Sequence, residues 1–224
     1  ARVNILGTVN LLDNCVKHGV DKFVFASSGG TVYGEPISLP VKEDHPERPL
    51  SPYGISKLTA ERYLQFYNEV RGVNCLSLRY GNVYGPRQDP YGEAGVIAIF
   101  SLRLLRGEPA IIFGDGEQVR DFIHVEDVVA ANLAALKFAS SEAQVVNIGT
   151  GVPTSVNVLL QKLTQCLGCD FRPTYQPARP GEIRTTYLDI ERAQSLLGWR
   201  PHISLDEGLL KTVDSFRELA SQTK

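Results

Sequence analysis

Segments with helical periodicity alternate with short apolar runs along most of this chain, and this alternation restricts its fold more than any other feature. The segment 4–18 repeats apolar residues at helical spacing, and Gly19 follows it as a helix stop. The apolar run Phe23–Ala26 comes next and has the composition of a strand. Such alternation predicts an α/β protein with a doubly wound, mainly parallel sheet. We expect helices over 4–18, 53–70, 95–106, 125–138, 155–167 and 205–220, and strands over 23–26, 74–80, 110–113 and 145–148.

Tyr53 and Lys57 stand four residues apart at the start of the predicted helix 53–70. At this spacing the two side chains lie one turn apart on one helix face, so an ammonium group can sit beside a phenol. A free phenol has a pKa of about 10 and is a poor base at neutral pH, but a neighbouring cation favours its ionised form. The pair is a candidate for acid–base catalysis, although any amphipathic helix can show this spacing by chance.

Small hydroxyl residues and glycines follow the predicted strand Phe23–Ala26, in the order Ser27, Ser28, Gly29, Gly30, Thr31. Open α/β sheets bind ligands at the carboxyl ends of their strands. We therefore expect hydroxyl groups of this loop to contact a substrate.

The composition excludes several classes of partner. The chain has 224 residues and a formal net charge of −2, so no broad basic surface for nucleic acid or anionic membranes is expected. No apolar run approaches the roughly 18 residues of a membrane span, and the first residues do not form a signal peptide. A cytoplasmic location is the expectation.

Four cysteines, at positions 15, 75, 166 and 169, are too few and too scattered for a disulfide framework. Cys166 and Cys169 have the spacing of a metal-binding pair, but no second pair or suitably spaced histidines accompany them. We expect two thiols at a helix end and no metal site.

Six motifs follow one another along the whole chain. They are Ala26-Ser27-Ser28 with Val32-Tyr33-Gly34, Tyr53-x-x-x-Lys57, and the runs 78–87 (LRYGNVYGPR), 119–124 (VRDFIH), 147–151 (NIGTG) and 179–182 (RPGE). In this order they resemble the extended short-chain dehydrogenase/reductases, and among them the NAD-dependent sugar-nucleotide epimerases related to UDP-glucose 4-epimerase. The resemblance implies a Rossmann-like fold, NAD as the cofactor and a UDP-sugar as the substrate.

The resemblance also implies roles for the residues already singled out. Tyr53 would take the proton from the sugar C4 hydroxyl, Lys57 would keep Tyr53 acidic and contact the nicotinamide ribose, and Ser28 would bridge Tyr53 and the sugar oxygen. Gly29 and Gly30 lengthen the loop by one residue relative to the usual pattern, so Thr31 is an alternative to Ser28. Further cofactor positions are matched by Asn4 and Tyr80.

Six residues match the family's contacts to the nucleotide-sugar: Asn82, Phe113, Arg120, Arg179, Glu182 and Thr186. By this match the asparagine contacts the sugar, the arginines bind the diphosphate, the phenylalanine packs on uracil and the glutamate accepts from a ribose hydroxyl. The small Thr186 would admit an N-acetyl group at C2 of the sugar. Without a ligand, the asparagine would be a turn residue, the arginines solvated and the phenylalanine part of a core strand. His124 is interpreted as structural, since the family uses the tyrosine as its base.

One motif of the family does not occur in this sequence. Family members open with a strand, a glycine-rich turn and a helix whose backbone N–H groups bind the pyrophosphate. We therefore expect a sheet that lacks its first units, with 1–84 as the C-terminal half of the NAD-binding domain. The region 85–224 would bind the nucleotide-sugar, and its segment 124–150 would return to the first domain. On this view the chain alone binds NAD weakly or not at all.

The loop after Ser28 favours one reaction of the family. Dehydratases and decarboxylases carry acidic residues directly after the hydroxyl, whereas Gly29 and Gly30 offer none. A 4-epimerase is therefore favoured over a dehydratase or reductase on the same scaffold, and over a non-catalytic nucleotide-sugar-binding fragment. The helices 4–18 and 53–70 match those that form a four-helix bundle between family subunits, with Leu6, Leu11 and Leu64 as apolar candidates, so a homodimer is expected. Ordinary packing of these helices on the sheet would explain the same apolar pattern.

Overall fold

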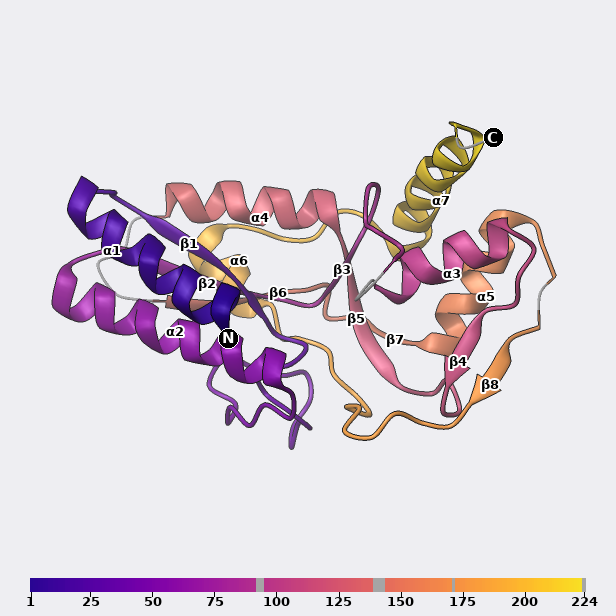
Figure 1. Ribbon diagram of the computed structural model, residues 1–224, viewed down its shortest axis with the longest axis horizontal. Helices are drawn as coiled ribbons and strands as arrows, with labels where there is room; N and C mark the ends of the chain where they lie inside the picture. Colours follow the sequence, from indigo (N-terminus) through magenta and orange to yellow (C-terminus); the bar gives the residue numbers. More distant parts are fainter. Residues whose placement is uncertain (92–94, 139–143, 171, 223–224) are drawn as a thin grey trace.

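The computed structural model describes residues 1–91, 95–138, 144–170 and 172–222, which form an α/β fold in two adjoining parts (Figure 1). The helices are η1 (Arg2–Gly7, a π-helix), α1 (Thr8–His18), α2 (Pro52–Arg71), α3 (Val96–Leu105), α4 (Val125–Lys137), α5 (Val156–Leu167), α6 (Glu191–Leu197) and α7 (Leu205–Gln222). The strands are β1 (Phe23–Ser28), β2 (Cys75–Tyr80), β3 (Asn82–Tyr84), β4 (Ile111–Phe113), β5 (Val119–His124), β6 (Gln144–Ile148), β7 (Pro153–Ser155) and β8 (Thr174–Gln176). No helix in the described part is long and apolar enough to cross a bilayer.

The first part is a parallel three-stranded sheet in the order β1-β2-β6, with helices on both faces (Figure 1). On one face, α1 and α2 bury Leu12 and Leu64 against Phe25 of β1. On the other face, α4 and α6 pack on β2 and β6, with Trp199 closing the core. This arrangement confirms the predicted doubly wound, mainly parallel sheet.

The N-terminus of α2 is fixed by local signals in the sequence. Ser51 is the N-cap, and its Oγ accepts a hydrogen bond from Gly54 N at 3.1 Å. Pro52 follows in the first turn, where a missing N–H costs nothing. These signals place Tyr53 in the first turn of the helix, at the carboxyl end of the sheet.

The chain passes from the first part to the second directly after β2. Gly81 separates β2 from β3, and a Cβ there would stand 2.8 Å from Asp121 O, so only glycine allows β5 to approach this closely. Strands β3, β5 and β7 form one small sheet and β4 pairs with β8. Helices α3, α5 and α7 bury Phe100, Leu163 and Val213 beside them.

All six predicted helices and all four predicted strands are present, with ends within two residues except at the start of the helix predicted over 4–18. Strand β1 continues to Ser28, and the first residues of the predicted helix wind as the π-helix η1 before α1 begins. The sequence analysis missed β3, β5, β7, β8 and α6. Three of these strands have three residues each, and β5 contains the charged pair Arg120-Asp121, so none has a clear two-residue apolar repeat.

Candidate functional site

Tyr53 and Lys57 lie one turn apart on α2, as the spacing predicts. Lys57 Nζ is 5.7 Å from the centroid of the Tyr53 ring and 4.9 Å from that of Phe25. The same nitrogen donates a hydrogen bond of 2.8 Å to Ala26 O on β1. Partial burial lowers the pKa of Lys57 from its ordinary value. The lysine therefore ties α2 to β1 while its charge stays beside the phenol.

The two adjacent serines of β1 point in opposite directions, as strand geometry requires. Ser27 is 3% exposed and its Oγ donates to the Glu61 carboxylate inside the protein. Ser28 and Tyr53 instead line one cavity of about 350 Å³. Thr31 lines the same cavity, and its Oγ1 is buried without a hydrogen-bond partner among the described residues. Both hydroxyls proposed from the sequence thus border the cavity of Tyr53.

Three residues extend this cavity towards the second part of the fold. Asn82, Arg120 and Glu182 line it and also line a second cavity of about 360 Å³. Arg120 Nη2 forms an ion pair with Glu182 Oε1 at 3.2 Å. Burial lowers the pKa of Arg120, with Glu182 acting in the opposite direction. A charged pair therefore marks the boundary between the two cavities.

The second cavity has an apolar wall with a cation over it. Phe113 of β4 lines it, and the Arg179 guanidinium carbon lies 3.9 Å from the centroid of the Phe113 ring. Ile99 of α3 and Val156 of α5 contribute further apolar surface. A flat aromatic base suits the apolar wall, and anionic groups suit the arginines at its edge.

A third cavity, of about 640 Å³, lies on another side of Tyr53 and Ser28. Tyr80, Asn82 and Gln88 also line it, and Gln88 Oε1 is buried with no partner in the described part of the chain. A nicotinamide fits this lining, since its carboxamide can donate to the buried oxygen of Gln88. Tyr80 Oη itself donates to Asn132 Oδ1 at 3.0 Å.

Three predicted site residues do not border these cavities, and one of them is Lys57, which contacts Ala26 O on β1 instead. Asn4 Nδ2 donates to Ser56 Oγ at 2.9 Å, which places Asn4 against the first turns of α2. Thr186 is 3% exposed, its backbone N–H donates to Val119 O at 3.1 Å, and it lines none of the three cavities. Its predicted role as a gate for the C2 substituent gains no direct support from this position.

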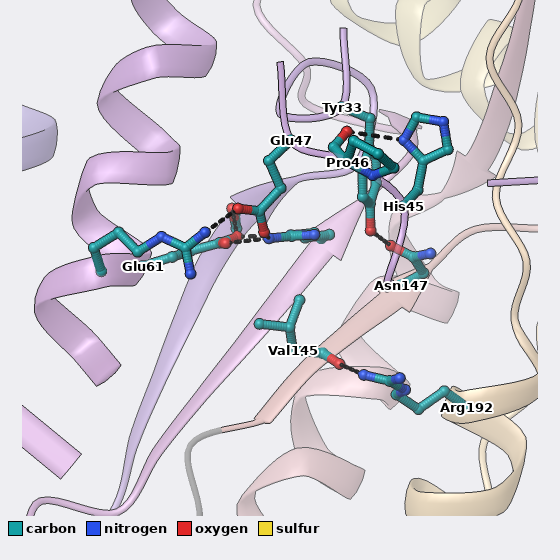
Figure 2. Close-up of polar contacts among 11 residues, drawn as sticks. Tyr33, His45, Pro46, Glu47, Glu61, Val145, Asn147 and Arg192 are labelled. Carbon is teal, nitrogen blue, oxygen red and sulfur yellow. Dashed lines mark hydrogen bonds and ion pairs between the residues drawn. The ribbon is translucent and has the colours of Figure 1, made fainter. Parts of the chain in front are cut away.

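Beside the site lies a buried charged network that the sequence analysis did not find (Figure 2). Arg79 of β2 is 1% exposed and pairs with the carboxylates of Glu61 and Glu47. Asp121, next to Arg120, is also buried and accepts hydrogen bonds from Thr150 and from the backbone of Gly151 and Leu188. A charged residue inside the apolar strand Cys75–Tyr80 was the one sequence signal available for the first of these groups.

The remaining candidates have structural positions. His124 is buried at the N-cap of α4, where its Nδ1 accepts from Glu126 N at 3.3 Å, and burial lowers its pKa. Cys166 and Cys169 are free thiols at the end of α5, as predicted. Among the described residues, no cluster of three potential protein ligands could hold a metal ion.

One correction concerns the predicted dimer surface: Leu6 and Leu11 are exposed, but Leu64 is 2% exposed in the core and cannot contribute to it.

Comparisons with known proteins identify the family to which this chain is similar. The model of the NAD dependent epimerase/dehydratase family matches residues 1–149. A protein of Methanocaldococcus jannaschii is 51% identical over 212 residues, which cover 95% of this chain and 68% of that protein. The UDP-glucose 4-epimerase of Mycolicibacterium smegmatis is 46% identical, over 97% of this chain and 69% of its own length.

Solved structures agree with the sequence comparisons. The crystal structure of UDP-glucose 4-epimerase from Thermotoga maritima with UDP-glucose superposes with a TM-score of 0.94 at 50% identity, covering 97% of this chain and 70% of that one. The UDP-glucose 4-epimerase of Thermus thermophilus in complex with NAD superposes with a TM-score of 0.86 at 44% identity, covering 96% and 70%. The protein therefore belongs to the NAD-dependent epimerase/dehydratase family.

Proposed function

We propose that the protein is an NAD-dependent UDP-sugar 4-epimerase that interconverts UDP-glucose and UDP-galactose. The observation that carries the proposal is the meeting of Ser28, Tyr53 and Asn82 at one cavity that adjoins two others. One neighbouring cavity has an apolar wall and arginines suited to a nucleoside diphosphate, and the other has the polar lining suited to a nicotinamide. The names of the relatives that match most of the chain support the same reaction.

Each residue has a role that follows from its position. Tyr53 holds or takes the proton of the sugar C4 hydroxyl, since its phenol borders the sugar-sized cavity. Lys57 stabilises the ionised phenol, and Ser28 orients the sugar oxygen. NAD bound beside Tyr53, Tyr80 and Gln88 would supply the hydride acceptor and donor for C4 of the sugar. Arg120 and Arg179 hold the diphosphate, and Phe113 packs on the base.

The space around Gly29 favours an epimerase over a dehydratase. A Cβ at this position would stand 2.7 Å from Leu188 Cδ1 and 3.0 Å from Arg79 O, so the acid that dehydratases place after the hydroxyl does not fit there. Gly30 has more room, because the nearest atom to its Cβ would be Asn82 Oδ1 at 3.6 Å.

A reductase is the alternative, since a dTDP-4-dehydro-6-deoxyglucose reductase of Escherichia coli is 35% identical over 96% of this chain.

Several finer features stay predictions. They are turnover of N-acetylated UDP-sugars, a homodimer formed through α1 and α2, a cytoplasmic location, and the division into domains 1–84 and 85–224 with 124–150 returning to the first. The exposed Leu6 and Leu11 support the dimer surface. A UDP-N-acetylglucosamine 4-epimerase from Methanobrevibacter ruminantium superposes at 34% identity and supports a test with acetylated sugars.

The test is interconversion of UDP-glucose and UDP-galactose by the protein as the cell produces it, supplied with NAD. Tyr53→Phe should lower kcat at least 1,000-fold, because it removes both general-base and general-acid catalysis and leaves UDP binding intact. Tyr63→Phe is the matched control, since Tyr63 lies on the same helix but lines none of the three cavities. Unchanged interconversion in Tyr53→Phe contradicts the proposal, and net NADH consumption with a 4-keto sugar would favour the reductase.

A further inference from the structure

A row of buried polar side chains crosses the first sheet directly beneath the site. Ser27 of β1 pairs in register with Arg79 of β2, and Arg79 pairs with Asn147 of β6. These side chains are 3%, 1% and 0% exposed. The next register row carries Ser28 and Tyr80, which line the third cavity, and Ser27 at the end of the buried row borders the same cavity. The buried row and the residues of the site therefore occupy consecutive register positions of the same sheet.

The buried row holds α2 through Glu61. Arg79 Nε donates to Glu61 Oε1 at 3.0 Å, and Ser27 Oγ donates to the same oxygen. Glu61 lies one turn beyond Lys57 and two turns beyond Tyr53 on α2. Lys57 contacts Ala26 O, and Tyr53 shares its cavity with Ser28. Successive turns of α2 are thus fixed against β1, with the catalytic phenol at the end of the series.

The same row also holds the loop that forms the opposite wall of the sugar cavity. Tyr33 Oη donates to Asn147 Oδ1 at 2.7 Å, and the Arg79 guanidinium carbon lies 4.8 Å from the Tyr33 ring (Figure 2). Glu47 pairs with Arg79 inside the protein and with Arg62 of α2 near the surface. This loop supplies Gly30, Thr31, Leu50 and Ser51 to the cavity.

Stability alone does not account for such a row. Removing a guanidinium and a carboxylate from water costs several kcal/mol, and replacing a buried ion pair with apolar side chains of similar volume is often neutral or stabilising. Neither Arg79 nor Glu61 lines any of the three cavities, so neither can contact the substrate directly. Their contacts instead converge on the two elements that must be aligned around the sugar, which are α2 and the loop 29–51.

We propose that Ser27, Glu61 and Arg79 are positioning residues, which fix Tyr53 of α2 relative to Ser28 of β1. This inference rests on the proposed epimerase function. The Glu61 carboxylate of α2 accepts three charge-assisted hydrogen bonds from Ser27 and Arg79 inside the protein. A shift of α2 along the sheet would break them, so the helix has one favoured register. Alignment of a reacting group within about 0.5 Å is what catalytic positioning demands.

The test replaces the whole polar group with apolar side chains, as Ser27→Ala, Glu61→Leu and Arg79→Met combined, in the protein as the cell produces it with NAD. We expect kcat to fall at least tenfold while the dissociation constant for UDP stays within twofold, because Phe113 and Arg179 lie in the other part of the fold. The thermal midpoint should not fall, since Glu47 keeps Arg62 as a partner. The double variant Lys162→Met, Asp206→Leu removes an ion pair between α5 and α7 and should change none of these values.

Amide hydrogen exchange gives a second readout that does not depend on turnover. The triple variant should exchange at least tenfold faster over residues 52–58 and keep its rates over 156–167. An unchanged kcat, or equal acceleration over the two segments, would overturn the proposal. If the triple variant does not fold, Ser27→Ala alone keeps the ion pair of Glu61 with Arg79. It should lower kcat at least threefold and speed exchange over residues 52–58 at unchanged UDP affinity. A normal kcat, or unchanged exchange over 52–58, also overturns the proposal. Absence of epimerisation by the unsubstituted protein would instead count against the proposed function, and the exchange data would still test the positioning.

Discussion

Lys57→Met should lower kcat of the epimerase about 100-fold at pH 7. Lys57 Nζ lies 5.7 Å from the Tyr53 ring centroid, and two unit charges about 6 Å apart near a protein surface interact by about 3 kcal/mol at an effective dielectric constant of about 20. A free-energy difference of this size changes the fraction of ionised phenol by about 100-fold. Methionine keeps the apolar stem beside Phe25, so the packing of α2 should survive.

The shape of the pH profile separates this charge effect from a loss of structure. As pH rises, Tyr53 ionises without help from the lysine, so the deficit of Lys57→Met should shrink at pH 10. Chromatographic separation of UDP-glucose and UDP-galactose measures kcat at both pH values under saturating NAD. Lys22→Met is the matched control, because Lys22 also lies over an aromatic ring, 5.3 Å from the Phe138 centroid, but far from the site. An equal deficit at pH 7 and pH 10, or a loss below threefold, would refute the electrostatic account.

Three further predictions concern other parts of the chain. Gly34→Ala should lower the free energy of unfolding by roughly 2–4 kcal/mol in chemical denaturation, because the new Cβ collides with Arg48 O at a φ of 70°. Gly72→Ala is the control: this residue has the same φ, but no atom lies within 4 Å of the new Cβ, so it should lower the free energy of unfolding by only about 1 kcal/mol. Hydrogen bonds from Arg184 hold the pKa of Asp115 at about 2. The lowered pKa of Asp115 stabilises the folded state at pH values above the pKa of the unfolded state, and this stabilisation is lost as the pH falls towards 2. In Arg184→Ala, carboxyl NMR should show the pKa of Asp115 rising towards 3.8. An unchanged pKa would exclude Arg184 as the cause of the shift. Arg120→Met should weaken UDP binding about 10- to 100-fold in calorimetry, whereas Arg217→Met on α7 should not.

The parts of the site that the sequence predicted are those set by local spacing. The pairing of Tyr53 with Lys57 follows from a four-residue interval on one helix. The position of Ser28 follows from its place at the end of a strand. These features depend on short stretches of chain, so helical and strand periodicity were sufficient to predict them.

The parts that the sequence did not predict depend on contacts between distant segments. Glu61 and Arg79 are 18 positions apart and meet only because α2 packs on β2. Asp121 binds backbone groups 29 to 67 positions away, which no local pattern encodes. Thr186 is buried and its backbone pairs with Val119, so its role at the sugar site stays a prediction from resemblance. Family motifs identify residue types, whereas the packing of elements decides which cavity each one reaches.

The two adjacent serines of β1 link the buried charged network to the site. Because successive strand residues face opposite sides, Ser27 must point to Glu61 whenever Ser28 borders the cavity. A one-residue slip of β1 would turn Ser27 away from Glu61 and Ser28 away from the cavity that Tyr53 lines. Glu61 would keep its ion pair with Arg79 of β2 but lose the hydrogen bond from Ser27, and an unmade hydrogen bond to a buried carboxylate costs more than a lost apolar contact. The hydrogen bond between Ser27 and the Glu61 carboxylate therefore discriminates against the misaligned strand.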